Sequence, residues 1–223
     1  MLPKYIVNPM PAQGSKEVMD LLDGVETATI GHWRLMGFCN RRIQPMLRGR
    51  HVVGTAVTLA IPGPDSTLLH HAAGLLRPGD ILLIDRLGDD RYACWGGGVT
   101  AAVKASGATA GVVDGPITDI AEIEESDLPI WSAGIAPITT RIYDLGGRMN
   151  VPVSIGGAVV QPGDYVLADD SGVVVLPPAE AEAEARRALA VQARGKESER
   201  MFRAREILLG ERSGASTKVR EGC

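Results

Sequence analysis

Three consecutive glycines, Gly96 to Gly98, stand directly before a run of helix-forming residues, Val99–Ser106. Glycine leaves the backbone amides of this loop without side-chain cover. The first turn of a helix also has unpaired N–H groups, and they lie at the positive end of the helix dipole. Such an arrangement binds carboxylate or phosphate groups. The spacing therefore predicts an anion-binding loop at this point of the chain.

An acidic residue follows the next predicted strand. Gly107 ends the helix, Ala110–Val113 is typical of a fully buried strand, and Asp114–Pro116 has the composition of a turn. Thr118 and Asp119 then open another helix. Open α/β sheets bind ligands beyond the carboxyl ends of their strands, so we expect the glycine loop and Asp119 to face one crevice.

Each feature also has a simpler structural interpretation, which the residues alone leave open. Triple glycine is common in flexible turns, and G-x-G-x-x-G, the dinucleotide fingerprint, is incomplete here. Asp119 stands three residues before Glu122, the spacing of a capping box, so its carboxylate is also a candidate cap for its own helix. Cys94, beside the loop, has no evident partner base and is expected to be a small buried residue rather than a nucleophile.

The stretch WGGGVTAAVKASGATAGVVDGPITDIAEI, followed by LPIW, resembles the class II 4-hydroxy-4-methyl-2-oxoglutarate aldolase family. That family also contains the regulator of ribonuclease E activity A. The resemblance continues upstream through VVGTAVTL and RPGDILLID and downstream through VPVSIGGAVVQPGDYVLADDSGVVVLP. It covers about residues 25–190, and its motifs are specific in combination.

The resemblance implies a swivelling β/β/α-type domain that assembles as trimers or hexamers, with active sites between subunits. In the family, the amides of the glycine loop bind the pyruvyl part of the substrate. An Arg-Asp pair after the next strand supplies a carboxylate clamp and a metal anchor. That pair falls on Thr118 and Asp119, so the residue for Mg²⁺ or Mn²⁺ is present and the arginine is absent. The implied substrate-binding positions are Gly96, Gly97, Gly98, Val99 and Thr118.

Several positions depart from the family pattern. Thr118 replaces the clamp arginine, and Gly97 stands where the family commonly has an acidic or amide residue. His32 occupies the aspartate place of an upstream Ser-Asp pair and is either a ligand or base, or a structural histidine. The missing positive charge has three candidate sources, Arg86, Arg91 and Arg141. The sequence assigns no general acid or base.

The predicted elements alternate in the manner of an α/β protein with a central mixed sheet flanked by helices. Helices are expected at 16–24, 27–36, 66–76, 99–106 and 119–126, and strands at 52–61, 81–84, 110–113 and 129–132. Residues 137–150 are expected to be irregular, and antiparallel strands to follow from Val151. We expect a single domain over residues 1–223, with its core at 25–190. A helical extension is expected at about 179–210, interrupted near Gly195.

Composition excludes several functional classes. The net charge of −4 leaves no basic patch for nucleic acid. No apolar run approaches the ~20 residues of a membrane span, and residues 1–15 lack the apolar core of a signal peptide. Cys39, Cys94 and Cys223 are odd in number and lack a C-x-x-C pair, which favours reduced thiols and a cytoplasmic location.

The function expected from the resemblance is metal-dependent cleavage of a carbon–carbon bond next to a 2-oxo acid, with release of pyruvate. Decarboxylation of oxaloacetate passes through the same enolate and is expected at the same site. A Schiff-base mechanism needs a buried lysine, whereas Lys104, the nearest, is expected to extend from its helix into solvent. The alternative is a non-catalytic regulator that binds ribonuclease E or a related partner.

Overall fold

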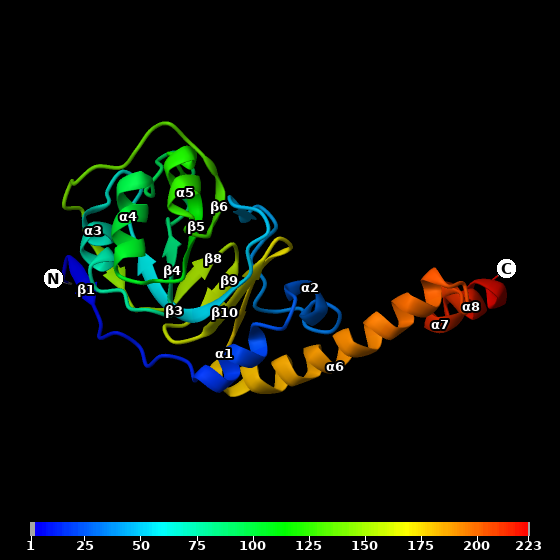
Figure 1. Cartoon of the computed structure of the whole chain (residues 1–223). Coiled ribbons are helices and arrows are strands. Elements are labelled where there is room, and N and C mark those ends of the chain that lie inside the picture. Colours follow the sequence, from blue (N-terminus) through cyan, green and yellow to red (C-terminus); the bar gives the residue numbers. More distant parts are fainter. Residues whose placement is uncertain (1–2, 223) are drawn as a thin grey trace.

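The computed structural model describes residues 3–222, which form a central mixed sheet flanked by helices (Figure 1). The strands are β1 (Tyr5–Val7), β2 (Gln44–Pro45), β3 (Val52–Ala60), β4 (Asp80–Asp85), β5 (Ala110–Ile117), β6 (Ile130–Ile135), β7 (Gly147–Met149), β8 (Val153–Ile155), β9 (Ala158–Val160), β10 (Tyr165–Asp169) and β11 (Gly172–Leu176). The helices are α1 (Lys16–Leu22), α2 (Thr27–Ile30), α3 (Thr67–Ala73), α4 (Gly97–Ala105), α5 (Ile120–Ser126), α6 (Pro178–Arg203), α7 (Leu209–Ser213) and α8 (Ala215–Glu221).

Four parallel strands, β3 to β6, form the centre of the sheet in the order of the chain, and α3, α4 and α5 connect them in turn. Strand β4 is buried along nearly its whole length, because both faces of the sheet are covered. On one face the core contains residues of α3, α4 and α5. On the other face it contains residues of β8 to β11. The apolar run that identified β4 is thus explained by its two covered faces.

Strand β3 makes the sheet mixed, because two strands share one of its edges. Its first half, from Val52 to Thr55, pairs antiparallel with β10, and Leu59–Ala60 pair antiparallel with β7. The expected α/β architecture with a mixed central sheet is therefore confirmed. The short strands β1 and β7, which extend the sheet beyond β3, were not predicted, because three-residue strands show too little periodicity.

Two local predictions were wrong. The helix expected over 27–36 ends at Ile30, and the chain then turns and leaves Leu35 and Met36 exposed. Asp114–Pro116, predicted as a turn, lies within β5. The strand continues past proline because its pairing with β6 shifts register between Val113 and Pro116, which is how strands accommodate a residue that cannot donate a ladder hydrogen bond.

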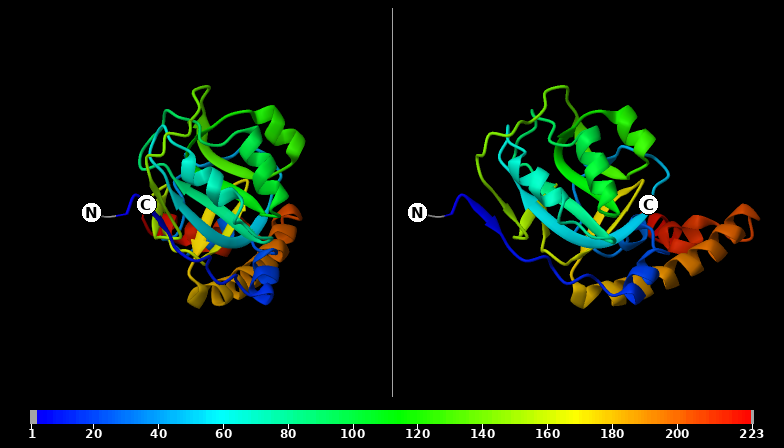
Figure 2. Two further views of the ribbon diagram at one scale, coloured as in Figure 1. Left: turned by 90° about the vertical axis from the view of Figure 1, so that its left-hand side faces the viewer. Right: turned by 60° about the vertical axis from the view of Figure 1, so that its left-hand side comes forward.

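The C-terminal segment is one long helix rather than two. Helix α6 runs through Gly195 without a break. Only its first half is anchored, where Ala181, Ala185 and Ala188 join a core cluster with residues of α1, α2, β10 and β11. Its second half extends away from the sheet and carries α7 and α8, as two views show (Figures 1 and 2). No helix within residues 3–222 combines the length and the apolar character that crossing a membrane requires.

Candidate functional site

The glycine loop is fixed by the tryptophan that precedes it. Trp95 is fully buried, and its indole lies where a side chain at Gly111 of β5 would otherwise be, so only glycine fits there. Its Nε1 donates to Thr100 Oγ1 at 2.8 Å. That hydroxyl in turn donates to the carbonyl of Gly96 at 2.9 Å. The loop is therefore an ordered start to a helix rather than a flexible turn.

Helix α4 begins two residues earlier than predicted. Gly96 is its N-cap, without a capping side chain, and Gly97 and Gly98 form its first turn. Gly97 is buried, whereas Gly98 is exposed with open space over its Cα. The amides of α4 that have no partner within the helix therefore begin at Gly97.

Asp119 lies against this helix start. Its Oδ2 accepts a hydrogen bond from the Gly97 amide at 3.0 Å, and its Oδ1 accepts one from Thr118 Oγ1 at 3.1 Å. The residue adopts a left-handed conformation, with φ 56° and ψ 46°, that turns its carboxylate away from its own helix. The capping-box interpretation is therefore wrong for this side chain, since Asp119 makes no cap hydrogen bond in α5.

A second carboxylate, which the sequence did not identify, belongs to Glu122. A Cβ built on Gly97 would lie 2.6 Å from Glu122 Cδ, so the Glu122 side chain occupies the space that a side chain at position 97 would take. Gly97 is also where the family commonly has an acidic or amide residue. The three-residue spacing of Asp119 and Glu122 was the available signal, since it puts both carboxylates near the start of α5.

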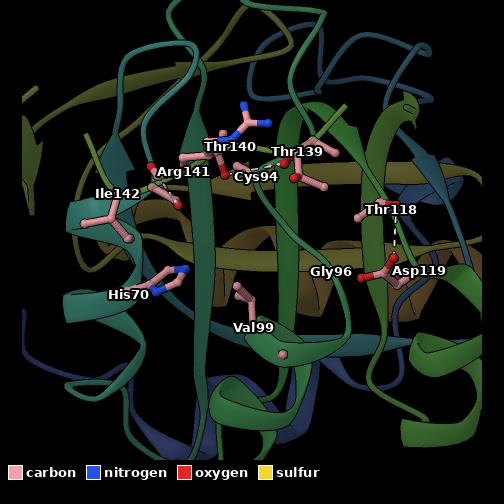
Figure 3. A pocket seen from close by; sticks show the side chains of 13 residues that line it. His70, Cys94, Gly96, Val99, Thr118, Asp119, Thr139, Thr140, Arg141 and Ile142 are labelled. Carbon is pink, nitrogen blue, oxygen red and sulfur yellow. Dashed lines mark hydrogen bonds between the residues drawn. The ribbon is translucent and has the colours of Figure 1, made fainter. Parts of the chain in front are cut away.

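A cavity of about 310 Å³ opens beside these residues at the carboxyl ends of β4 and β5 (Figure 3). It is lined by Ser66, His70, Ala93, Cys94, Gly96, Gly98, Val99, Thr118, Asp119, Thr139, Thr140, Arg141 and Ile142. It thus brings together all the predicted substrate and metal residues except Gly97, whose amide points to Asp119 instead. From the loop at 139–142 only Arg141 was considered a candidate for this site, and His70 was not predicted to meet it.

Asp65 holds that loop over the cavity. Its buried carboxylate accepts hydrogen bonds from the amides of Tyr143, at 2.8 Å, and Leu145, at 2.9 Å, and from Thr67. Desolvation would raise the pKa of Asp65, but these hydrogen bonds outweigh it and hold the pKa below its ordinary value. The backbone N–H of Arg141 donates to Pro64 O at 2.9 Å, which fixes the other end of the loop.

Of the three candidate arginines, only Arg141 lines the cavity. Arg86 is fully buried and donates to the carbonyls of Gly63 and Tyr92 and to the carboxylate of Asp89. Arg91 lies over the ring of Tyr92, with 5.4 Å between the guanidinium carbon and the ring centroid. The guanidinium of Arg141 forms no ion pair with any residue from 3 to 222.

The structure also places the cysteines, Lys104 and His32 apart from the proposed chemistry. Burial raises the pKa of the Cys94 thiol to about 11, although the charge of Arg86 opposes the shift, so Cys94 is a buried thiol as expected. Cys39 is also free, and Cys223 lies outside the described residues. Lys104 is exposed and donates to the carbonyl of Ser126, which excludes it as a buried Schiff-base lysine. His32 lines a different hollow, between α2 and α6.

The donors at the cavity fit a hard cation that keeps much of its hydration. No cluster of three or more His, Cys, Asp or Glu side chains with metal-binding geometry occurs in the part of the chain that the structure describes. Asp119, with Glu122 nearby, instead supplies carboxylate oxygens at an exposed position. Mg²⁺ commonly binds through one or two carboxylates, with water and substrate completing its shell.

The fold and the cavity together define an α/β protein whose candidate site lies between a glycine-rich helix start and an acidic residue. The profile of the RraA-like family, described as Aldolase/RraA, matches residues 18–175. The chain therefore belongs to the RraA-like family.

Named relatives of the chain are of two kinds. A protein of Halalkalibacterium halodurans named "Putative 4-hydroxy-4-methyl-2-oxoglutarate aldolase" is 32% identical over 165 residues, covering 74% of this chain and 73% of the relative. A protein of the same name from Ectopseudomonas mendocina is 30% identical over 140 residues, covering 61% of this chain and 86% of the relative. The crystal structure of Streptomyces coelicolor RraAS2, described as an unusual member of the RNase ES inhibitor RraA family, superposes with a TM-score of 0.76. It is 28% identical and covers 85% of this chain and 98% of that one.

Proposed function

We propose that the protein is a divalent-metal-dependent lyase that cleaves a carbon–carbon bond next to a 2-oxo acid and releases pyruvate. The observation that carries the proposal is the cavity that joins the start of α4, Asp119 and Arg141. The aldolase names of its relatives support the same reaction class. Oxaloacetate decarboxylation is proposed as a second reaction, since both reactions leave the enolate of pyruvate.

Asp119, assisted by Glu122, would hold Mg²⁺ or Mn²⁺. When bound, the cation supplies a positive charge that stabilises an enolate at the 2-oxo oxygen. The hydrogen bonds from Gly97 and Thr118 orient the Asp119 carboxylate for this role. The free amides of Gly98 and Val99 at the start of α4 would bind the pyruvyl carboxylate.

Arg141 would take over the work of the missing clamp arginine. Arg141 lines the cavity, whereas Arg86 and Arg91 are engaged elsewhere. A guanidinium binds carboxylates through two parallel hydrogen bonds. Thr118 is too short and uncharged for that contact. The positive charge would therefore come from the loop at 139–142 instead of from the end of β5, where the family has its arginine. The substrate is then a small 2-oxo acid with a second carboxylate.

We also propose that the protein is a homo-oligomer, a trimer or hexamer. Beside the cavity, the loop that carries Arg141 exposes Ile138, Ile142, Tyr143 and Leu145 to solvent. Apolar side chains grouped in this way are typical of a contact surface. A neighbouring subunit on this loop would close the cavity to water.

The proposal is tested by an assay of pyruvate release from 4-hydroxy-4-methyl-2-oxoglutarate and from oxaloacetate, with Mg²⁺ or Mn²⁺ and with EDTA. We expect release only with metal, and recovery of activity when metal is restored to the chelated protein. Full activity in EDTA would refute the metal-dependent mechanism, and no release from either substrate would refute the lyase.

A second candidate function is regulation of a ribonuclease by protein binding. It is favoured by the similarity to RraAS2, which is described as belonging to a family of RNase ES inhibitors. Such a role needs a partner surface but no metal. The Asp119→Ala protein distinguishes the two candidates. A regulator would still inhibit ribonuclease E after this substitution, whereas a lyase would lose its release of pyruvate.

A further inference from the structure

A histidine that no motif pointed to lines the cavity. His70 lies on α3, and its ring points into the cavity from the side opposite Asp119 (Figure 3). The next residue, His71, lines a separate hollow with Tyr5, Val7, Thr67 and Leu68. Adjacent helical residues point about 100° apart, so α3 turns one imidazole toward the cavity and the other away.

His70 differs chemically from the other ionisable groups of the cavity. The pKa of the Cys94 thiol, raised to about 11 by burial, keeps it protonated at neutral pH. A guanidinium does not give up its proton in proteins, so arginine is no general base. Asp119 is engaged by its two hydrogen-bond donors. Below α3, Asp65 is occupied by the amides of the loop that it anchors. Imidazole is the side chain that ordinarily gains and loses a proton between pH 5 and 8.

We propose that His70 is the proton-transfer residue of the cavity; the proposal rests on the lyase function. Neutral His70 takes the proton of the C4 hydroxyl of a 4-hydroxy-2-oxo acid. The C3–C4 bond breaks, the C4 carbon becomes a carbonyl, and the electron pair of the bond forms the enolate of pyruvate. The imidazolium then returns the proton to C3, which becomes the methyl group of pyruvate. Atoms and charge balance without any further reactant.

The neighbouring histidine provides a matched control. His70→Gln removes the imidazole at the cavity, and His71→Gln makes the same change one residue further along the same helix. We expect kcat for cleavage of 4-hydroxy-4-methyl-2-oxoglutarate to fall ~10²–10⁴-fold in His70→Gln, as for the loss of a general base. We also expect the acid limb of its kcat/KM–pH profile to disappear. His71→Gln should keep both the rate and the profile.

Decarboxylation separates proton transfer from a merely structural role. Oxaloacetate has no hydroxyl proton to remove, so its decarboxylation needs His70 only for the final proton, which water also supplies. We expect His70→Gln to lose at least ~10-fold more in aldol cleavage than in decarboxylation. Equal losses in the two reactions, or an unchanged pH profile, would overturn the proposal.

A binding measurement tests the role of His70 even if the protein proves not to be a lyase. The ring signals of the histidines are followed by NMR while oxalate, an analogue of the pyruvate enolate, is added with Mg²⁺. Their assignment comes from the two variants. A chemical-shift change for the ring of His70 but not of His71 supports His70 as the group that faces the ligand. A His70 signal that does not move at saturating oxalate contradicts it, whereas an inactive wild-type protein refutes the lyase instead.

Discussion

The carboxylate of Asp119 lies 3.0 Å from the amide nitrogen of Gly97, so the acidic residue and the glycine-rich helix start are bonded to each other. The left-handed backbone of Asp119 makes this contact possible, because it turns the side chain away from α5 and toward α4. The Gly97 amide thus positions the Asp119 carboxylate, next to the Gly98 and Val99 amides that would bind an anion. Substitutions in the loop should therefore act through Asp119.

Gly96 and Gly98 should respond in opposite ways to alanine. A Cβ on Gly96 would overlap the Asp119 carboxylate and break its bond to Gly97, whereas a Cβ on Gly98 meets nothing within 4 Å. We expect Gly96→Ala to destabilise the protein by ~1 kcal/mol and to lower activity. Gly98→Ala should raise stability by ~0.5–1 kcal/mol, as alanine does within a helix. Thermal unfolding of both variants tests this, and a destabilised Gly98→Ala protein would contradict the described geometry.

Arg141 should determine affinity for dicarboxylate substrates. Loss of a charged hydrogen bond costs ~1.5–3 kcal/mol, so Arg141→Gln should raise KM for oxaloacetate ~10–100-fold. Arg141→Lys should recover only part of this, because lysine lacks the planar fork. Arg91→Gln is the control, since Arg91 lies over Tyr92 rather than in the cavity. An Arg141→Gln enzyme with the KM of wild type would show that another group binds the carboxylate.

Thr118→Arg should lower activity rather than restore the family's clamp. Thr118 and Arg141 line the same cavity, so a second guanidinium would repel the first and would compete for Asp119. We expect kcat/KM for oxaloacetate to fall in both Thr118→Arg and Thr118→Lys. A rise in kcat/KM in Thr118→Arg alone would instead indicate that the pocket is otherwise unchanged and lacks only the clamp arginine.

Asp65 should contribute to both stability and substrate binding, because it anchors the loop that covers the cavity. Hydrogen bonds hold the pKa of Asp65 below its ordinary value in the folded protein. Its contribution is therefore full above the unfolded-state pKa, ~3.9, and is lost as pH falls through the folded pKa. Asp65→Asn should cost ~2 kcal/mol at pH 7 and raise KM. Urea unfolding at pH 7 and near pH 3 checks this, because the difference between wild type and variant should shrink at the lower pH.

The sequence predicted the parts of the site that come from one continuous stretch. The triple glycine, the buried strand and Asp119 are neighbours in the chain, so their types and spacing were sufficient to place them beyond one strand end. His70 and Arg141 reach the cavity only through the packing of α3 and the anchoring of a loop by Asp65, which no local pattern encodes.

Backbone conformation set the other limit on prediction. The capping-box spacing of Asp119 and Glu122 is real, but a left-handed residue reverses the direction in which the side chain points. Asp114–Pro116 has turn chemistry, yet the pairing of β5 with β6 absorbs it as an irregularity. The single-domain organisation, the cytoplasmic location and the oligomer number stay predictions.

Asp119 is the residue through which the metal is proposed to support catalysis. The direct measurement is the rate of Mn²⁺-dependent pyruvate release from oxaloacetate by Asp119→Asn. The control is Asp127→Asn, which changes another exposed, left-handed aspartate at the opposite end of the same helix, where it pairs with Arg50. We predict that Asp119→Asn keeps its fold and that its rate falls at least ~100-fold. The fall is expected because the variant holds the metal less well and so loses several kcal/mol of charge stabilisation in the transition state. Asp127→Asn should stay within twofold of wild type. Wild-type rates and Mn²⁺ dependence in Asp119→Asn would contradict the account.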